Sequence, residues 1–121
     1  MAKKVISVDD SASVRQMVSF TLESNGYQVI TAIDGQEAFN RLKTEQVDMV
    51  ITDLNMPNMD GITLIKSLRA LPGYKFTPMI LLTTESQEQR KQEGRAAGAT
   101  GWIVKPFEQD KLLAVVKKVL G

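Results

Sequence analysis

Apolar residues occur in two kinds of segment that alternate along the chain. Short, nearly continuous apolar runs occupy residues 5–8, 27–32, 47–52, 79–83 and 102–104. Such runs, bounded by polar or turn-forming residues, are typical of strands buried on both faces of a parallel sheet. The longer segments between them carry apolar residues at helical spacing. The pattern therefore predicts five strands alternating with five helices.

The first two predicted helices have recognisable ends. In the first, apolar residues repeat at i, i+3 and i+4 from Val14 to Leu22. Gly26 follows, and glycine readily takes the left-handed conformation that ends many helices. Asp34 with Glu37 resembles a capping box and predicts the start of the second helix.

The other three helices are predicted from similar signals. Asp60 is expected to cap the third helix, which Pro72 is expected to end. Ser86 with Gln89 is expected to open the fourth, although residues 86–95 contain no apolar side chain. In the fifth, acidic residues come early and lysines late, the order favoured by the helix macrodipole.

Strict alternation of strands and helices implies parallel strands joined by right-handed crossovers, with helices on both faces. The predicted fold is α/β, with three layers around a doubly wound parallel sheet of five strands. In such sheets ligands bind beyond the carboxyl ends of the strands, where strand order reverses. Candidate site residues are therefore those that end or follow a strand.

Composition narrows the function classes. The 121 residues include 15 lysines and arginines and 14 aspartates and glutamates, a net charge of +1 that disfavours nucleic-acid binding. The chain has no cysteine and no histidine, which excludes thiolate or imidazole zinc sites and catalysis by these residues. No apolar run is long enough to span a membrane. We expect a cytoplasmic protein with no membrane or nucleic-acid partner.

Polar and charged groups lie at four of the five predicted strand ends. They are three carboxylates, two hydroxyls, an amine and a proline: Asp9, Asp10, Asp53, Thr83, Thr84, Lys105 and Pro106. Each alone is explained by capping, turn formation or solvation. Their coincidence at strand ends that share one edge favours a functional site.

The chemistry of these groups indicates phosphoryl transfer. Crowded carboxylates repel one another, and a hard divalent cation such as Mg²⁺ relieves this with oxygen ligands. Asp53 is the expected nucleophile, because aspartate forms an acyl phosphate and the reaction mainly needs positioning and charge neutralisation. A cation and Lys105 would supply that neutralisation.

Other phosphate sites are disfavoured. The chain has no G-x-G-x-x-G and no P-loop motif, and the acidic loop at residues 9–10 would repel the phosphate of a nucleotide or of FMN. A Mg²⁺-dependent phosphatase with an aspartate nucleophile remains an alternative, since residues 53–55 loosely match its D-x-D motif. In such enzymes, however, the nucleophile follows the first strand. A third alternative is a binding module that is never phosphorylated.

The motifs resemble the receiver domain of two-component response regulators, most of all its stand-alone chemotaxis members. They are VDDSASVR, TDLNMPNMDG, LLTTES and GATGWIVKPF, at residues 8–15, 52–61, 81–86 and 98–107. The resemblance implies the flavodoxin-like (βα)5 strand order and a single receiver domain over residues 1–121, without an output domain. It also implies a signalling protein rather than an enzyme.

Site roles follow from the resemblance. Asp53 would accept the phosphoryl group, and Asp10 and Asp53 would bind Mg²⁺ directly with the Asn55 main-chain carbonyl. Asp9 would act through water. Once Asp53 is phosphorylated, Thr83 would form a hydrogen bond with the phosphoryl group. Lys105 would form an ion pair with the same group. Further residues implied to shape or tune the site are Pro57, Gly61, Glu85 and a cis Pro106.

Two residues depart from the family pattern. Trp102 stands where tyrosine or a smaller aromatic residue is usual, and Thr84 where a small residue is common. We expect Thr84 to narrow access to Asp53. We expect Trp102 to alter how the side chain at this position moves between buried and exposed positions. The expected output surface is the fourth helix, the fifth strand and the last helix, coupled to the site through Thr83 and Trp102.

The resemblance also implies partners. A sensor histidine kinase of the chemotaxis type would donate the phosphoryl group. A flagellar motor switch protein or another target would bind the phosphorylated form, and a phosphatase would remove the group. The alternative is a stand-alone receiver that relays phosphate in a different two-component pathway.

Overall fold

The computed structural model describes residues 2–84 and 89–120. The elements follow one another in the order β1 (Lys4–Val8), α1 (Ala12–Glu23), β2 (Gln28–Ala32), α2 (Gly35–Leu42), β3 (Met49–Asp53), α3 (Gly61–Arg69), the 3₁₀ turn η1 (Pro72–Tyr74), β4 (Met79–Thr83), α4 (Lys91–Ala97), β5 (Gly101–Val104) and α5 (Gln109–Leu120). Within this part of the chain, no helix is long and apolar enough to cross a membrane.

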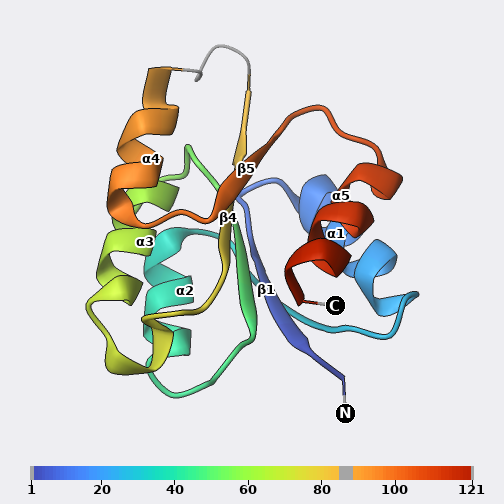
Figure 1. Ribbon diagram of the computed structural model, residues 1–121, viewed down its shortest axis with the longest axis horizontal. Coiled ribbons are helices and arrows are strands. Elements are labelled where there is room, and N and C mark those ends of the chain that lie inside the picture. Colours follow the sequence, from blue (N-terminus) through green and yellow to red (C-terminus); the bar gives the residue numbers. More distant parts are fainter. Residues whose placement is uncertain (1, 85–88, 121) are drawn as a thin grey trace.

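The strands form one parallel sheet in the order β2-β1-β3-β4-β5. Strand order reverses between β1 and β3, because the chain first adds β2 on one side of β1 and then crosses to the other. Helices cover both faces of the sheet, with α2, α3 and α4 on one side and α1 and α5 on the other (Figure 1). The predicted three-layer (βα)5 fold is confirmed.

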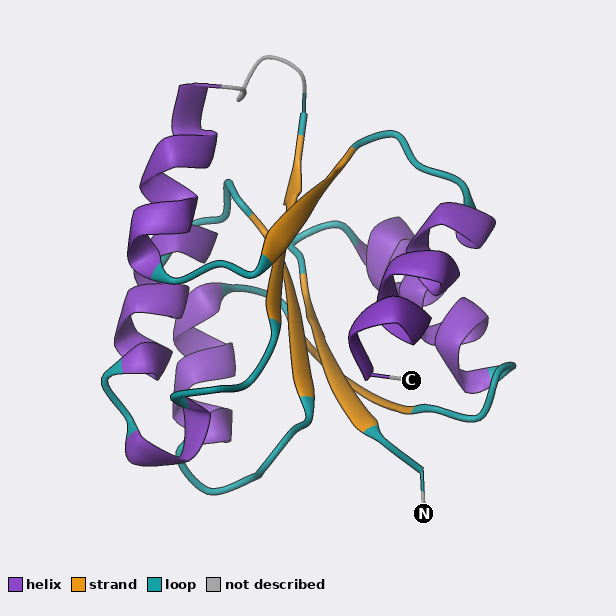
Figure 2. Cartoon of the chain, in the orientation of Figure 1, coloured by secondary structure: helices purple, strands orange, loops and turns teal. Residues whose placement is uncertain are grey.

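Successive strand side chains point to opposite faces and build two cores. One core packs β-strand residues such as Val50 and Leu81 against α2, α3 and α4. The other packs residues such as Ile51 and Leu82 against α1 and α5. The sheet is therefore enclosed between helical layers, as Figure 2 shows, and its strand ends provide the polar edge.

The predicted helix caps are largely confirmed. Gly26 has a φ of 91° just beyond α1. Asp34 accepts a hydrogen bond from the Glu37 N–H at 2.8 Å, and the Glu37 side chain accepts one from Ile33 N–H, one residue earlier than in a standard capping box. Asp60 likewise caps α3 through the Thr63 N–H at 2.8 Å.

Some predicted boundaries differ from the structure, and one falls on residues that the structure does not describe. Val47 is buried but precedes β3, which begins at Met49. Helix α3 ends at Arg69, and Pro72 begins a separate 3₁₀ turn instead of ending the helix. The described part of the fourth helix begins at Lys91, and Ser86, the expected start, lies outside the described residues.

The loop between η1 and β4 lies at the amino end of β4, at the edge of the sheet opposite the polar strand ends. Tyr74 in η1 is buried and donates its hydroxyl to the Leu42 carbonyl at 2.8 Å. Phe76, two residues later, is 88% exposed. This edge carries an anchored turn followed by a projecting aromatic ring.

Candidate functional site

The polar groups predicted at the strand ends lie at one edge of the sheet. Asp53 and Thr83 are the last residues of β3 and β4, Asp9 follows β1 and Lys105 follows β5. Because β1, β3, β4 and β5 are consecutive neighbours in a parallel sheet, their carboxyl ends are adjacent. Figure 1 shows β4 and β5 side by side in the sheet, running in the same direction.

Three carboxylates form an acidic cluster. One oxygen from each of Asp9, Asp10 and Asp53 lies within 4.8 Å of the others. Asp9 is fully buried, Asp53 is 7% exposed and Asp10 is exposed. The all-oxygen donor set and the close spacing suit a hard divalent cation such as Mg²⁺. The residues present therefore fit the ion that the sequence predicts.

Lys105 lies against this cluster. Its Nζ is 3.0 Å from Asp9 Oδ2 and 3.1 Å from Asp53 Oδ1. The peptide bond between Lys105 and Pro106 is cis, as the family resemblance implies. The amine therefore bridges two carboxylates that belong to different strand ends.

Burial and charge perturb both partners of this ion pair. Burial, together with the nearby Asp9 carboxylate, raises the pKa of Asp53 despite the opposing effect of Lys105. The pKa of Lys105 is also raised: burial opposes its charge, but hydrogen bonds and attraction from Asp9 and Asp53 outweigh this. Lys105 therefore stays protonated and available as a counter-ion at neutral pH.

The Asp53 shift predicts a pH-dependent stability. The folded state binds this proton more tightly than the unfolded chain, so the free energy of unfolding falls as pH rises from the ordinary Asp value of 3.8 through the raised pKa. Asp53→Asn lacks this titration. In EDTA, its stability relative to wild type should increase as pH rises from about 4 through the raised pKa of Asp53. Urea unfolding across this range measures the difference, and a pH-independent difference would contradict the prediction.

The side chains of Asp9 and Asp10 differ in the hydrogen bonds and ion pairs that they form with the described residues. Asp9 Oδ1 accepts the Ser11 N–H at 2.9 Å, and Oδ2 contacts Lys105. Arg15 fixes the same turn by donating to the Asp9 carbonyl at 2.7 Å. Among the described residues, none forms a hydrogen bond or ion pair with the Asp10 side chain. Asp10 is thus the more accessible of the two carboxylates.

The Thr83 hydroxyl is buried without a hydrogen-bond partner in the described part of the chain. Leaving a buried hydroxyl unpaired is unfavourable by about 1–3 kcal/mol. The residue ends β4, next to β3 and its terminal Asp53. A hydroxyl held in this way is suited to donate a hydrogen bond to an incoming group. Thr84 follows and is half-buried.

The loop after β3 carries the remaining predicted ligand. Asn55 is exposed in this loop, and Pro57 lies in the same stretch. Gly61 begins α3 against the strand end, where an added Cβ would collide with the Asp53 carbonyl oxygen. The glycine therefore allows the helix to start close to the candidate phosphoacceptor.

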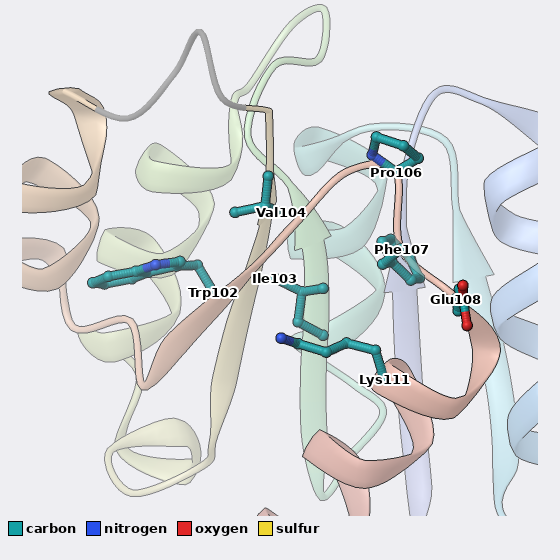
Figure 3. Close-up of a pocket in the computed structure, with 7 residues that line it drawn as sticks. All are labelled: Trp102, Ile103, Val104, Pro106, Phe107, Glu108 and Lys111. Atoms are coloured by element: carbon teal, nitrogen blue, oxygen red, sulfur yellow. The ribbon is translucent and has the colours of Figure 1, made fainter.

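Trp102 lies on the face of the sheet that also carries Thr83. Thr83 pairs with Val104, two residues beyond Trp102 on β5, so the three side chains share a face. The indole extends toward α4 (Figure 3), where Lys91 Nζ and Arg95 Cζ lie 5.1 and 5.3 Å from the ring centroid. These are cation–π distances. The tryptophan therefore connects β5 to the helix expected to form part of the output surface.

A hollow of about 430 Å³ adjoins Trp102. Its other lining residues include Phe107 and Lys111, which approach from the β5–α5 connection and from α5 (Figure 3).

Glu85, which is expected to tune the site, lies outside the described residues.

Sequence reasoning missed two contacts beside the site. One is the Arg15 bond to the Asp9 carbonyl, and the other is a 2.7 Å bond from Asn58 Nδ2 to Asp34 Oδ2. Neither contact has a periodic signature, although Arg15 stands in the first quoted motif and Asn58 in the second.

Comparisons of the sequence and of the structure with known proteins point to the same family. The sequence model described as "Response regulator receiver domain" matches residues 5–117. The solved structure of the Vibrio cholerae chemotaxis response regulator CheY4 is 50% identical, with a TM-score of 0.94, and the match covers 99% of this chain and 100% of that one.

Curated relatives include both chemotaxis and transcriptional proteins. A CheY homologue from Campylobacter jejuni is 39% identical, over 98% of this chain and 92% of its own length. PhoP from Bacillus subtilis, a regulator of alkaline phosphatase synthesis, is 38% identical over 99% of this chain but 49% of its own. The chain thus spans about half the length of the first curated relatives it matches.

Proposed function

The chain belongs to the response regulator receiver domain family, and from that premise we propose a phosphorylation switch in which Asp53 accepts a phosphoryl group from a sensor histidine kinase. The observation that carries the proposal is the buried Asp53 carboxylate, 3.1 Å from Lys105 and grouped with two other carboxylates. Phosphoryl transfer depends on positioning and charge neutralisation. This arrangement supplies both.

Mg²⁺ is the proposed cofactor. Asp10, Asp53 and the Asn55 main-chain carbonyl would hold the ion directly, and Asp9 would act through water. The division agrees with the contacts of Asp9, whose two oxygens are already engaged by Ser11 and Lys105. The bound ion supplies charge neutralisation for the phosphoryl oxygens.

The remaining chemistry belongs to the chain's own residues. Leu54 N–H and Lys105 Nζ bond to Asp53 Oδ1 at 3.0 and 3.1 Å and fix the carboxylate plane. The other oxygen, Oδ2, attacks phosphorus. An O–P bond forms as the P–N bond to the kinase's phosphohistidine breaks, and the imidazole leaves with the electron pair. Lys105 then pairs with a phosphoryl oxygen, exchanging one anionic partner for another.

The phosphoryl group would be lost slowly by attack of water, without the turnover of an enzyme. Asn55 and Glu85 are proposed to set that lifetime, because by resemblance they flank the path of the attacking water. Thr84 is proposed to limit access to the same space.

Thr83→Val is expected to have opposite effects on stability and switching. Removing the unpaired buried hydroxyl while nearly conserving volume should raise the free energy of unfolding by about 1 kcal/mol. The same change removes the donor proposed to bond the phosphoryl group, so the phosphorylation-dependent change in fluorescence of Trp102, the chain's single tryptophan, should disappear. Urea unfolding and steady-state emission measure the two effects. A destabilised variant whose emission still responds like wild type would contradict both.

The output surface is proposed to comprise α4, β5 and α5, with the hollow beside Trp102 as its recess. A bond from Thr83 to the phosphoryl group forms only after phosphorylation, which supplies the differential interaction that a population shift requires. Movement of Thr83 would change the space on the face it shares with Trp102.

Chemotaxis is the proposed pathway. The 50% identity with Vibrio cholerae CheY4 favours it over transcriptional control of alkaline phosphatase synthesis or of the phosphate regulon, for which PhoP and PhoB proteins are 34–38% identical. The proposed partners are a chemotaxis-type histidine kinase, a flagellar motor switch protein or other target, and a phosphatase, all met in the cytoplasm. A phosphorelay outside chemotaxis is the alternative, motivated by the PhoP and PhoB relatives.

Intact-mass analysis tests the proposal. The protein is incubated with acetyl phosphate with and without Mg²⁺, and separately with phosphorylated kinases of the chemotaxis and phosphate-regulon types. We expect a single phosphoryl group, added only with Mg²⁺ and fastest from the chemotaxis kinase. No mass gain would refute the switch, and faster transfer from the other kinase would refute the pathway. Continuous hydrolysis of several phosphate esters would instead indicate a phosphatase.

A further inference from the structure

The loop at residues 55–60 joins the candidate phosphoacceptor strand to α3. Its two ends are anchored by main-chain hydrogen bonds. Leu54 N–H donates to the Leu82 carbonyl at 3.1 Å, and Gly61 N–H donates to the Leu54 carbonyl at 2.9 Å. The intervening residues carry the proposed Asn55 ligand, so their conformation bears directly on the site.

The centre of this loop is a tight turn at Asn58. The Met59 N–H donates to the Pro57 carbonyl at 2.7 Å, and Asn58 between them has a φ of 68°. Asparagine tolerates this left-handed region better than most residues, but three-residue turns with positive φ are uncommon and strained. Such a conformation persists only where the surroundings hold it.

The start of α2 supplies those surroundings. Asp34 accepts the Glu37 N–H on Oδ1 at 2.8 Å and the Asn58 side-chain amide on Oδ2 at 2.7 Å. Gly35 N–H donates to the Met59 carbonyl at 3.2 Å, and a Cβ on Gly35 would lie 2.5 Å from that oxygen. The start of α2 is therefore bound to the loop by the Asp34 side chain and by the close main-chain contact between Gly35 and Met59.

The Asp34 contact is charge-assisted. Asp34 is 6% exposed, and hydrogen bonds from Glu37 N–H and the Asn58 amide lower the pKa of its carboxyl group. It is therefore ionised at neutral pH, and bonds to a charged acceptor are stronger than neutral ones. Asn58 is exposed, so the amide would otherwise bond to water.

We propose that Asp34 and Asn58 are positioning residues for phosphorylation: their hydrogen bond holds the 55–60 loop against α2 and thereby fixes the main chain at Asn55 relative to Asp53. The inference rests on the proposed function, because it assigns these residues an effect on the Mg²⁺ site. Neither residue belongs to the acidic cluster, so both act through the loop.

Two substitutions isolate the bond. Asn58→Gly keeps access to positive φ but removes the amide. Asp34→Ser keeps a helix-capping oxygen but removes the second acceptor. Asn40→Ala is the matched control, because it removes an exposed side-chain bond from Gln36 within the same helix, at 3.3 Å, without touching the loop. The double variant Asp34→Ser/Asn58→Gly completes a mutant cycle.

Calorimetric Mg²⁺ titration without a phosphodonor gives the first measurement. Each single substitution should weaken Mg²⁺ binding by about three- to tenfold, less than the roughly 10–100-fold typical for partners that touch a metal ligand. The double variant should be no weaker than the weaker single, since both remove one bond. Phosphorylation by acetyl phosphate should slow at low Mg²⁺ and recover at saturating Mg²⁺, while Asn40→Ala behaves as wild type.

Several results would overturn the inference. They are Mg²⁺ affinity within twofold of wild type in Asn58→Gly, additive losses in the double variant, or slow phosphorylation that saturating Mg²⁺ does not restore. Asn58 is an exposed loop residue, so Asn58→Gly decides the outcome even if Asp34→Ser unfolds. If wild type itself neither binds Mg²⁺ nor accepts phosphate, the proposed function fails. If wild type does both and the variants match it, only the positioning role fails.

Discussion

Asp53→Asn should abolish phosphoryl acceptance, lowering the rate of mass gain from acetyl phosphate by at least about 10³-fold. The amide lacks the anionic oxygen that attacks phosphorus. The Asn carbonyl oxygen is nearly the same size and can still accept the bonds that Leu54 N–H and Lys105 make to Asp53. The fold should therefore be retained, and loss of labelling would report on chemistry.

Asp60→Asn is the matched control. Asp60 is an aspartate of the same loop region that caps α3 and lies outside the acidic cluster, and asparagine caps helices equally well. Intact mass with Mg²⁺ should show one phosphoryl group on this control and none on Asp53→Asn. Labelling of Asp53→Asn at the wild-type rate would show that another residue accepts the group.

Gly61→Ala should lower the free energy of unfolding by about 2–3 kcal/mol and also impair labelling. The new Cβ would collide with the Asp53 carbonyl oxygen and lie 3.0 Å from Leu81 Cδ2. One obstacle is main chain in a central strand, so neither a rotamer change nor a surface shift relieves it. The structure must move α3 or the end of β3, and the second movement displaces the phosphoacceptor.

Gly73→Ala provides the comparison. A Cβ there would meet only the end of the Gln46 side chain, at 3.3 Å, and that side chain can turn away. Urea unfolding should show a small change for Gly73→Ala and a large one for Gly61→Ala. Equal stabilities for the two variants would mean that the close approach at Gly61 is easily relaxed.

The sequence pattern predicted most of the fold because burial leaves a strong signal. Each apolar run contains most of a strand, but the run reports burial and not hydrogen bonding. Val47 is buried, yet the next residue, Asp48, uses its side chain to accept the Lys4 N–H at 2.8 Å, and the ladder of β3 begins only at Met49. Strand boundaries therefore fall within the apolar pattern at positions it does not mark.

The candidate site was predictable because parallel topology turns sequence position into spatial proximity. Asp9, Asp53 and Lys105 each stand at a strand end, and the sheet brings them into contact. The bond between Asp34 and Asn58 was not predictable, since it joins two turns 24 residues apart through side chains alone. The orientation of Trp102 was also not predictable, because it depends on where Lys91 and Arg95 of α4 lie in space.

The exposed Phe76 offers an attachment point on the side of the molecule opposite the candidate site. It precedes β4, and Thr83, the last residue of that strand, lies about 13 Å beyond Met79, the first, at a rise of about 3.3 Å per residue. The chain has no cysteine, so Phe76→Cys would introduce a unique thiol and remove only a ring that is 88% exposed. A dye or a solid support coupled there would leave Asp53 facing the solution, with every immobilised molecule presenting the same edge to an incoming kinase.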